Sequence, residues 1–83
     1  WWLSLKGGDS VVVRREGVSV RRAPSDSGAV WKVIGLAWSD MRIEGNPDGT
    51  AWALPIEGTD DAWLQVNPAP LPLFVKSSDV KPR

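Results

Sequence analysis

Proline and glycine recur so often along this chain that they decide its fold class. Seven Pro and eight Gly are spread over 83 residues, and no stretch of about twelve residues free of both has the apolar spacing of an amphipathic helix. Short runs of β-branched and aromatic residues stand between them, a pattern typical of a small sandwich or barrel. The sequence therefore predicts an all-β protein without helices of ordinary length.

The apolar runs define the expected strands. Each is bounded by Gly, Pro, Asn, Asp or Ser, which favour turns. The expected strands are Trp1–Lys6, Ser10–Arg15, Val18–Arg22, Val30–Ala37, Met41–Glu44, Thr50–Ile56, Ala62–Val66 and Leu73–Lys76.

The composition excludes most catalytic and metal chemistry. The chain has no Cys and no His, so it cannot form a disulfide, a thiolate site or an imidazole base, and only carboxylates remain as strong metal ligands. Its 83 residues allow one small domain, and no apolar run reaches the roughly eighteen residues of a membrane span. We therefore expect a non-enzymatic protein with no cofactor, no metal site and no membrane insertion.

One turn is marked clearly by its residues, Gly45-Asn46-Pro47-Asp48-Gly49. Pro47 presets φ, Asp48 suits the next turn position, and Gly49 can take the positive φ of a bulge, so the segment predicts a hairpin. Residues 44–49, from Glu44 to Gly49, also fit the first six positions of a calcium loop, but Pro55 stands where such a loop needs Glu. The hairpin explains these residues better than a calcium site.

The two ends of the chain share a pattern. Trp2-Leu3-Ser4-Leu5 matches Trp63-Leu64-Gln65-Val66, and Val11-Val12-Val13-Arg14 falls on Leu73-Phe74-Val75-Lys76 after a one-residue gap. The offset is about the length of one small barrel. Two explanations are open: a tandem repeat, or a chance similarity between two pairs of strands.

In the tandem reading, residues 1–10 are the trailing strand or strands of a preceding unit and residues 11–83 form the barrel. An unpaired edge is a template for association, so the N-terminal strand could pair with a neighbouring copy to form an oligomer or filament. The residues expected in that pairing are Trp1, Trp2, Leu3 and Leu5.

Three motifs in order resemble bacterial Src-homology-3-like (SH3-like) domains. They are "VSVRRAPS" at 18–25, "PIEGTDDAWLQV" at 55–66 and "PLFVKSSDV" at 72–80. Phe74 replaces the usual Trp of the third motif, and about ten residues between Ser39 and Gly49 look inserted. The resemblance implies a barrel of five to six short antiparallel strands, with an inserted hairpin near 39–52 and extra N-terminal strands, on a secreted or cell-envelope protein that binds cell-wall peptides, glycans or protein partners.

Alternation along the strands divides the aromatic side chains between two faces. Leu64 and Val66 should face the core, which puts Trp63 and Gln65 on the outer face, and Phe74 falls there too. With Trp38, these residues are the candidate ligand-binding surface, where rings could stack on a sugar or a peptide. The alternative is that a loop covers the rings. Trp52 is expected in the core.

Charge separates along the chain although the total is zero. Residues 1–25 carry five positive and two negative side chains, and residues 26–61 carry two positive and seven negative. Nucleic-acid binding usually requires a net positive charge, so no nucleic-acid partner is expected. The partner that the resemblance implies is a cell-wall peptide, a glycan or a protein, with self-association as the alternative. An enzyme would need a partner to supply the missing base.

Overall fold

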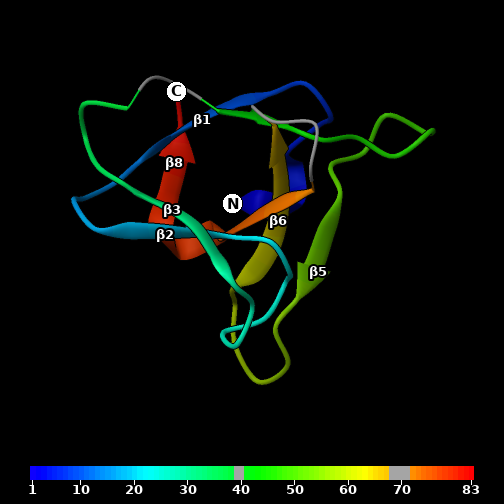
Figure 1. The fold of residues 1–83 in the computed structure, drawn as a ribbon. Coiled ribbons are helices and arrows are strands. Elements are labelled where there is room, and N and C mark those ends of the chain that lie inside the picture. Colours follow the sequence, from blue (N-terminus) through cyan, green and yellow to red (C-terminus); the bar gives the residue numbers. More distant parts are fainter. Residues whose placement is uncertain (39–40, 68–71) are drawn as a thin grey trace.

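The computed structural model describes residues 1–38, 41–67 and 72–83. These residues form an all-β domain of eight antiparallel strands in one sheet and contain no α-helix (Figure 1). Two short 3₁₀ helices, η1 (Trp2–Ser4) and η2 (Ser77–Asp79), complete it. The strands are β1 (Ser10–Val13), β2 (Val18–Arg21), β3 (Val30–Ile34), β4 (Met41–Ile43), β5 (Ala53–Pro55), β6 (Ala62–Asn67), β7 (Leu73–Lys76) and β8 (Val80–Pro82).

The sheet is curved but not closed. Its strand order is β3-β2-β7-β6-β4-β1-β8, with β5 also paired to β6. No described strand pairs with the outer edge of β3 or of β8. The all-β prediction is therefore confirmed, whereas a closed barrel is not observed among the described residues.

Period-two alternation builds the core. Val11 and Val13 in β1 and Val18 and Val20 in β2 are nearly inaccessible to solvent, and the residues between them are half-buried. Every such valine that leaves water contributes about 1.5–3 kcal/mol. The other core members are Leu5, Ile34, Met41, Ile43, Leu64, Val66, Leu73, Val75 and Val80.

Strands β4 and β5 lie end to end along the same edge of β6. Ile43 pairs with Val66 and Ala53 with Leu64, so the residues between Ile43 and Ala53 form an excursion that leaves the sheet and returns. Its two limbs meet at Gln65, whose carbonyl accepts from Glu44 N and whose N–H donates to Trp52 O. The excursion projects as the green loop at the right of Figure 1.

The tip of the excursion is the hairpin turn that its residues predicted. Gly49 N donates to Asn46 O at 2.9 Å, and Gly49 has φ 89°, as expected for a type I turn with a glycine bulge. The Asp48 carboxylate accepts from the backbone and hydroxyl of Thr50. The predicted hairpin spanned 39–52, of which residues 39–40 lie outside the described part.

The predicted N-terminal strand over Trp1–Lys6 is wrong. Trp2–Ser4 form a 3₁₀ turn, and only Lys6 makes an isolated bridge, to Thr50. The physical reason lies in the contacts of the segment: its backbone closes a tight turn, with Leu5 N donating to Trp2 O, and Leu5 enters the core. The matching segment Trp63–Val66 is a paired strand, so the two segments differ in conformation.

Two further elements were not expected. Residues 77–79 form η2, and β8 then pairs with β1 through Val80 and Val13. Strand β3 ends at Ile34, earlier than predicted, because a turn from Gly35 to Trp38 follows, closed by Trp38 N donating to Gly35 O.

Candidate functional site

The outer face of β6 and β7 carries three of the four predicted ligand-binding residues. Gln65 pairs directly with Phe74, and Trp63 pairs with Lys76 on the same face. The neighbouring Leu64 and the Val66 beyond are in the core. The prediction that alternation places Trp63, Gln65 and Phe74 opposite the core is confirmed.

The two rings on this face are covered. Trp63 and Phe74 are each only 6% exposed. The Lys76 ammonium lies 5.4 Å from the Trp63 ring centre and forms an ion pair with Asp26 at 2.7 Å, which ties the β2–β3 loop across the outer face. Of the two alternatives, open rings or rings under a loop, the structure has the covered arrangement, and only Gln65 of the three is half-exposed.

Trp52 belongs to this outer layer and not to the core, which corrects the prediction. Its ring centre lies 5.3 Å from that of Phe74, with planes inclined by 59°. The reason is register: Leu54 pairs with Trp63, so the face that Leu54 and Trp52 share by alternation is the outer one. Ala51 and Ala53, on either side of Trp52, pack against the core instead.

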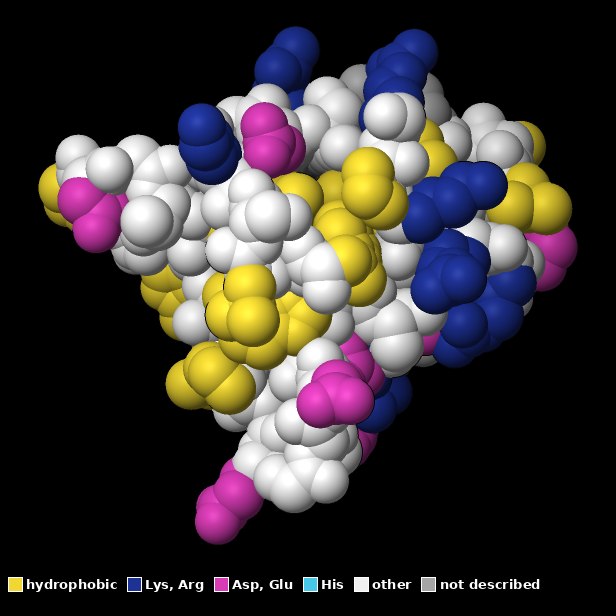
Figure 2. All heavy atoms as spheres, turned by 180° about the vertical axis from the view of Figure 1, so that it is seen from behind, with side chains coloured by type: hydrophobic (Ala, Val, Ile, Leu, Met, Phe, Trp, Pro, Cys, Tyr) yellow, Lys and Arg dark blue, Asp and Glu magenta, His cyan; other side chains and the backbone are white. Residues whose placement is uncertain are grey.

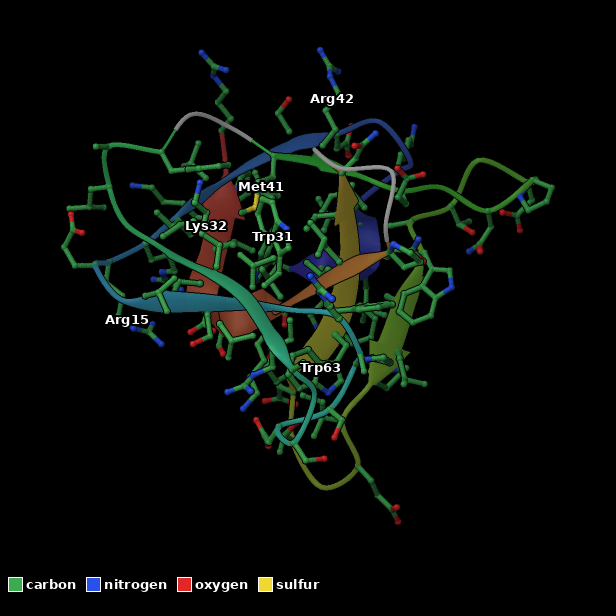
Figure 3. The ribbon with its side chains drawn as sticks, viewed as in Figure 1. Arg15, Trp31, Lys32, Met41, Arg42 and Trp63 are labelled. Carbon is green, nitrogen blue, oxygen red and sulfur yellow. The ribbon has the colours of Figure 1, made fainter. Side chains whose placement is uncertain are left out.

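Trp38, the fourth predicted binding residue, lies apart from the other three. It packs against the core and meets Trp31 edge-to-face, with ring centres 6.4 Å apart. Figure 3 draws Trp31 and Lys32 together beside β3, and Trp63 in a separate part of the view. The four residues predicted as one surface therefore form two groups.

The residues predicted for strand pairing have unlike environments. Leu5 is 9% exposed within the core, whereas Leu3 is 83% exposed. Trp2 is half-buried, and its indole N–H donates to Asp60 O at 2.7 Å. Trp1 is 44% exposed, and its side chain borders a pocket.

This pocket brings together four segments that are distant in sequence. Its volume is about 330 Å³. Trp1 comes from the N-terminal segment, Arg14 directly follows β1, and Thr59 to Asp61 come from the β5–β6 loop. Ser77 and Ser78 of η2 complete the lining. We call it the Trp1 pocket; its lining residues are Trp1, Arg14, Thr59, Asp60, Asp61, Ser77 and Ser78.

Asp61 connects the β5–β6 loop to η2 within the Trp1 pocket. Its carboxylate accepts from Ala62 N at 2.9 Å, Ser78 N at 3.0 Å and Ser78 Oγ at 2.6 Å, and also from the Ser77 hydroxyl. Burial by itself raises the pKa of Asp61, but hydrogen bonds from Ser77, Ser78 and Ala62 outweigh it and set the pKa below the ordinary value of 3.8. Near neutral pH the Asp61 carboxylate is therefore charged, and its oxygens already accept hydrogen bonds from these donors.

Two charged groups in the pocket have no such partner. Neither the Arg14 guanidinium nor the Asp60 carboxylate forms a hydrogen bond or an ion pair with a described side chain. The backbone of each is fixed, since Arg14 N donates to Asp79 O and Asp60 O accepts from Trp2. An aromatic surface, a cation and an anion are thus available in one pocket.

Sequence reasoning did not find the Trp1 pocket. Of its lining residues, only Trp1 is a candidate from the sequence alone, and there the pattern predicts strand pairing. A partial signal existed, since Thr59-Asp60-Asp61 precedes a strand and Ser77-Ser78 follows one, and hydroxyl and carboxylate side chains at such ends bond to local backbone. Nothing in the local pattern brings Trp1 to them.

Side chains of both charges surround a hydrophobic area on one face of the molecule. In Figure 2, Lys and Arg side chains lie along the top and the right of this face, Asp and Glu side chains are scattered around it, and several hydrophobic side chains lie in the middle. Among the described residues, no three carboxylates lie close enough to hold a metal ion. None of the helices in the described ranges has the length and apolar character needed to cross a bilayer.

Comparison with known proteins leaves the family open. No protein-family model matches the chain, and no curated protein or solved structure matches it either. The likeness of its three motifs to bacterial SH3-like domains therefore stays a prediction.

Proposed function

We propose that this chain is a non-catalytic, SH3-like binding module of a secreted or cell-envelope bacterial protein, and that it holds a cell-wall peptide or glycan in the Trp1 pocket. The resemblance of the three motifs supports the class of protein and its location. The observation that carries the binding role is the pocket itself, in which an exposed indole lies with a guanidinium and a carboxylate that pair with no side chain in the described part of the chain.

The chemistry of a cell-wall fragment suits these groups. Its sugar rings offer flat C–H faces that stack on an indole such as Trp1. Its peptide carboxylates can accept two hydrogen bonds from a guanidinium such as that of Arg14, and its amines and hydroxyls can donate to Asp60. Each of these three groups thus has a matching group in the ligand.

The outer-face rings stabilise the sheet beside the Trp1 pocket and do not contact the ligand. Trp63 and Phe74 are covered, so they stabilise β6 and β7, and Asp61 at the start of β6 then fixes the pocket floor. Gln65 and Trp38 do not line the Trp1 pocket, and they are not part of this binding surface.

The test measures binding to purified peptidoglycan sacculi by co-sedimentation and to muramyl dipeptide by NMR. Arg14→Gln and Asp60→Asn should each weaken binding about tenfold, the loss expected for one hydrogen bond to a charged group. Arg22→Gln is the matched control, because Arg22 is exposed and does not line the pocket. Equal retention of Arg14→Gln and the unaltered protein, or no retention of either, would reject the proposal.

A second candidate function is self-association, in which copies of the chain pair through strand β3 and not through residues 1–10. This strand is at one end of the sheet, and its apolar side chains Val30 and Val33 are 47% and 59% exposed; an edge of this kind can pair with another chain. Residues 1–10 are less suited to that role, because Leu5 is in the core of its own chain. Light scattering should give a dimer or larger assembly that Val33→Lys converts to monomer; a monomeric unaltered protein rejects this candidate.

A further inference from the structure

Trp31 and Trp38 form two perpendicular walls around a cation. Their ring planes meet at 89°, and the Lys32 ammonium lies 4.7 Å from the Trp38 ring centre and 5.6 Å from that of Trp31. Both distances are within the range of about 6 Å for cation–π attraction. Lys32 forms no ion pair with any described carboxylate, so these rings are its visible partners.

A bulge in the β2–β3 ladder builds the first wall. Val20 pairs with Lys32 and Arg21 with Val30, which leaves Trp31 without a partner across the ladder. A bulge of this kind turns two consecutive side chains toward one face. Trp31 consequently packs against the core, next to Lys32 and not opposite it.

A braced turn builds the second wall. Trp38 N donates to Gly35 O, and the Glu16 carboxylate accepts from Leu36 N at 3.0 Å. Trp38 also packs against the core. Both rings are therefore held by the fold, whereas the Lys32 side chain between them is exposed and has a flexible four-carbon stem.

We propose that the Trp31–Trp38 pair is a second ligand site, specific for a quaternary ammonium group such as that of choline, and that Lys32 occupies it until such a ligand displaces it. Aromatic walls favour quaternary ammonium groups, which are far less hydrated than the primary ammonium of lysine. Lys32 returns to water when displaced, at little cost. The site shares no residue with the Trp1 pocket, so the proposal is independent of the function proposed above.

The experiment follows the indole N–H signals of Trp31 and Trp38 by NMR while choline chloride is added to the full chain. Saturable shifts at millimolar choline are expected. The neutral isostere 3,3-dimethyl-1-butanol has the same shape without the charge and should shift these signals at least fivefold less at equal concentration. Phosphocholine and choline-containing vesicles then distinguish a soluble from a membrane-borne source of the same group.

Two variants decide between a site and a packing contact. Lys32→Gln removes the competing cation and should tighten choline binding about fivefold, the equivalent of one cation–π contact. Lys76→Gln is the matched control, because Lys76 lies over a single covered ring, Trp63, and it should leave choline binding unchanged. The proposal is overturned if neither the unaltered protein nor Lys32→Gln shows saturable shifts, or if the isostere shifts the indoles equally.

Discussion

The backbone of Gly7 lies directly against the backbone of Gly45. A Cβ atom on Gly7 would stand 2.5 Å from Gly45 Cα, and one on Gly45 would stand 2.9 Å from Gly7 Cα. This approach lets Gly7 N donate to Gly49 O at 3.0 Å and lets Lys6 bridge Thr50. The contact fastens the N-terminal segment to the excursion between β4 and β5.

Gly45→Ala should therefore lower the free energy of unfolding by about 1–3 kcal/mol, the usual cost of overpacking. The gain from a stiffer unfolded chain, about 0.4–1 kcal/mol, is too small to offset it. Chemical denaturation measures the difference. The control is Lys6→Ala, which removes an exposed side chain at the same contact and should change stability by less than about 0.5 kcal/mol; equal stabilities of the two variants would contradict the close approach.

Asp61→Ala should lower the free energy of unfolding by about 1.5–3 kcal/mol, because it removes a charged carboxylate that accepts several hydrogen bonds. The folded pKa of Asp61 is below its ordinary value of 3.8. Its contribution to stability is thus complete above that pH and is lost as the pH falls through the folded pKa.

Chemical denaturation of the unaltered protein and of Asp61→Asn at pH 7, 4 and 2 checks the direction of this pH dependence. The stability difference between them should shrink on acidification below about pH 4, where the carboxylate becomes protonated. A difference that stays constant or grows toward pH 2 would show that Asp61 is not held as an anion.

Much of the sheet could be predicted from local pattern, because strands such as β1 and β2 alternate between buried and half-buried residues. Val11 and Val13, like Leu64 and Val66, are buried in the period of two that their spacing implies. The hairpin at Asn46–Gly49 was predictable for a similar reason, since its turn chemistry depends on adjacent residues alone.

Long-range contacts decided what local pattern could not. The letters Trp-Leu-x-apolar occur at 2–5 and at 63–66, yet only the second segment has strands to pair with on both sides. Trp52 shows the same limit, because alternation put it on one face with Leu54, and only the pairing of Leu54 with Trp63 reveals that this face is the outer one. The Trp1 pocket and the Trp31–Trp38 pair depend likewise on contacts that the sequence does not encode locally.

Trp63→Ala should destabilise the fold by about 3–5 kcal/mol, as large-to-small changes of buried aromatic residues do. The indole lies outside the core, but it is only 6% exposed under Lys76 and the β2–β3 loop. Trp1→Ala, at a ring that is 44% exposed, is the control and should change stability by less than about 0.5 kcal/mol. Thermal unfolding followed by circular dichroism compares them, and a Trp63→Ala protein as stable as Trp1→Ala would mean that the loop does not cover the ring in solution.

Leu5→Ala should lower the free energy of unfolding by about 2–4 kcal/mol, whereas Leu3→Ala should leave it almost unchanged. The two leucines are two residues apart, but Leu5 is in the core at 9% exposure and Leu3 is 83% exposed. If residues 1–10 instead paired with a neighbouring copy, the effect of Leu5→Ala would depend on protein concentration, because the lost contacts would be intermolecular. Denaturation at two concentrations a hundredfold apart separates the cases: equal midpoints with a clear loss for Leu5→Ala place this leucine in the core of its own chain, and midpoints that rise with concentration assign it to a partner.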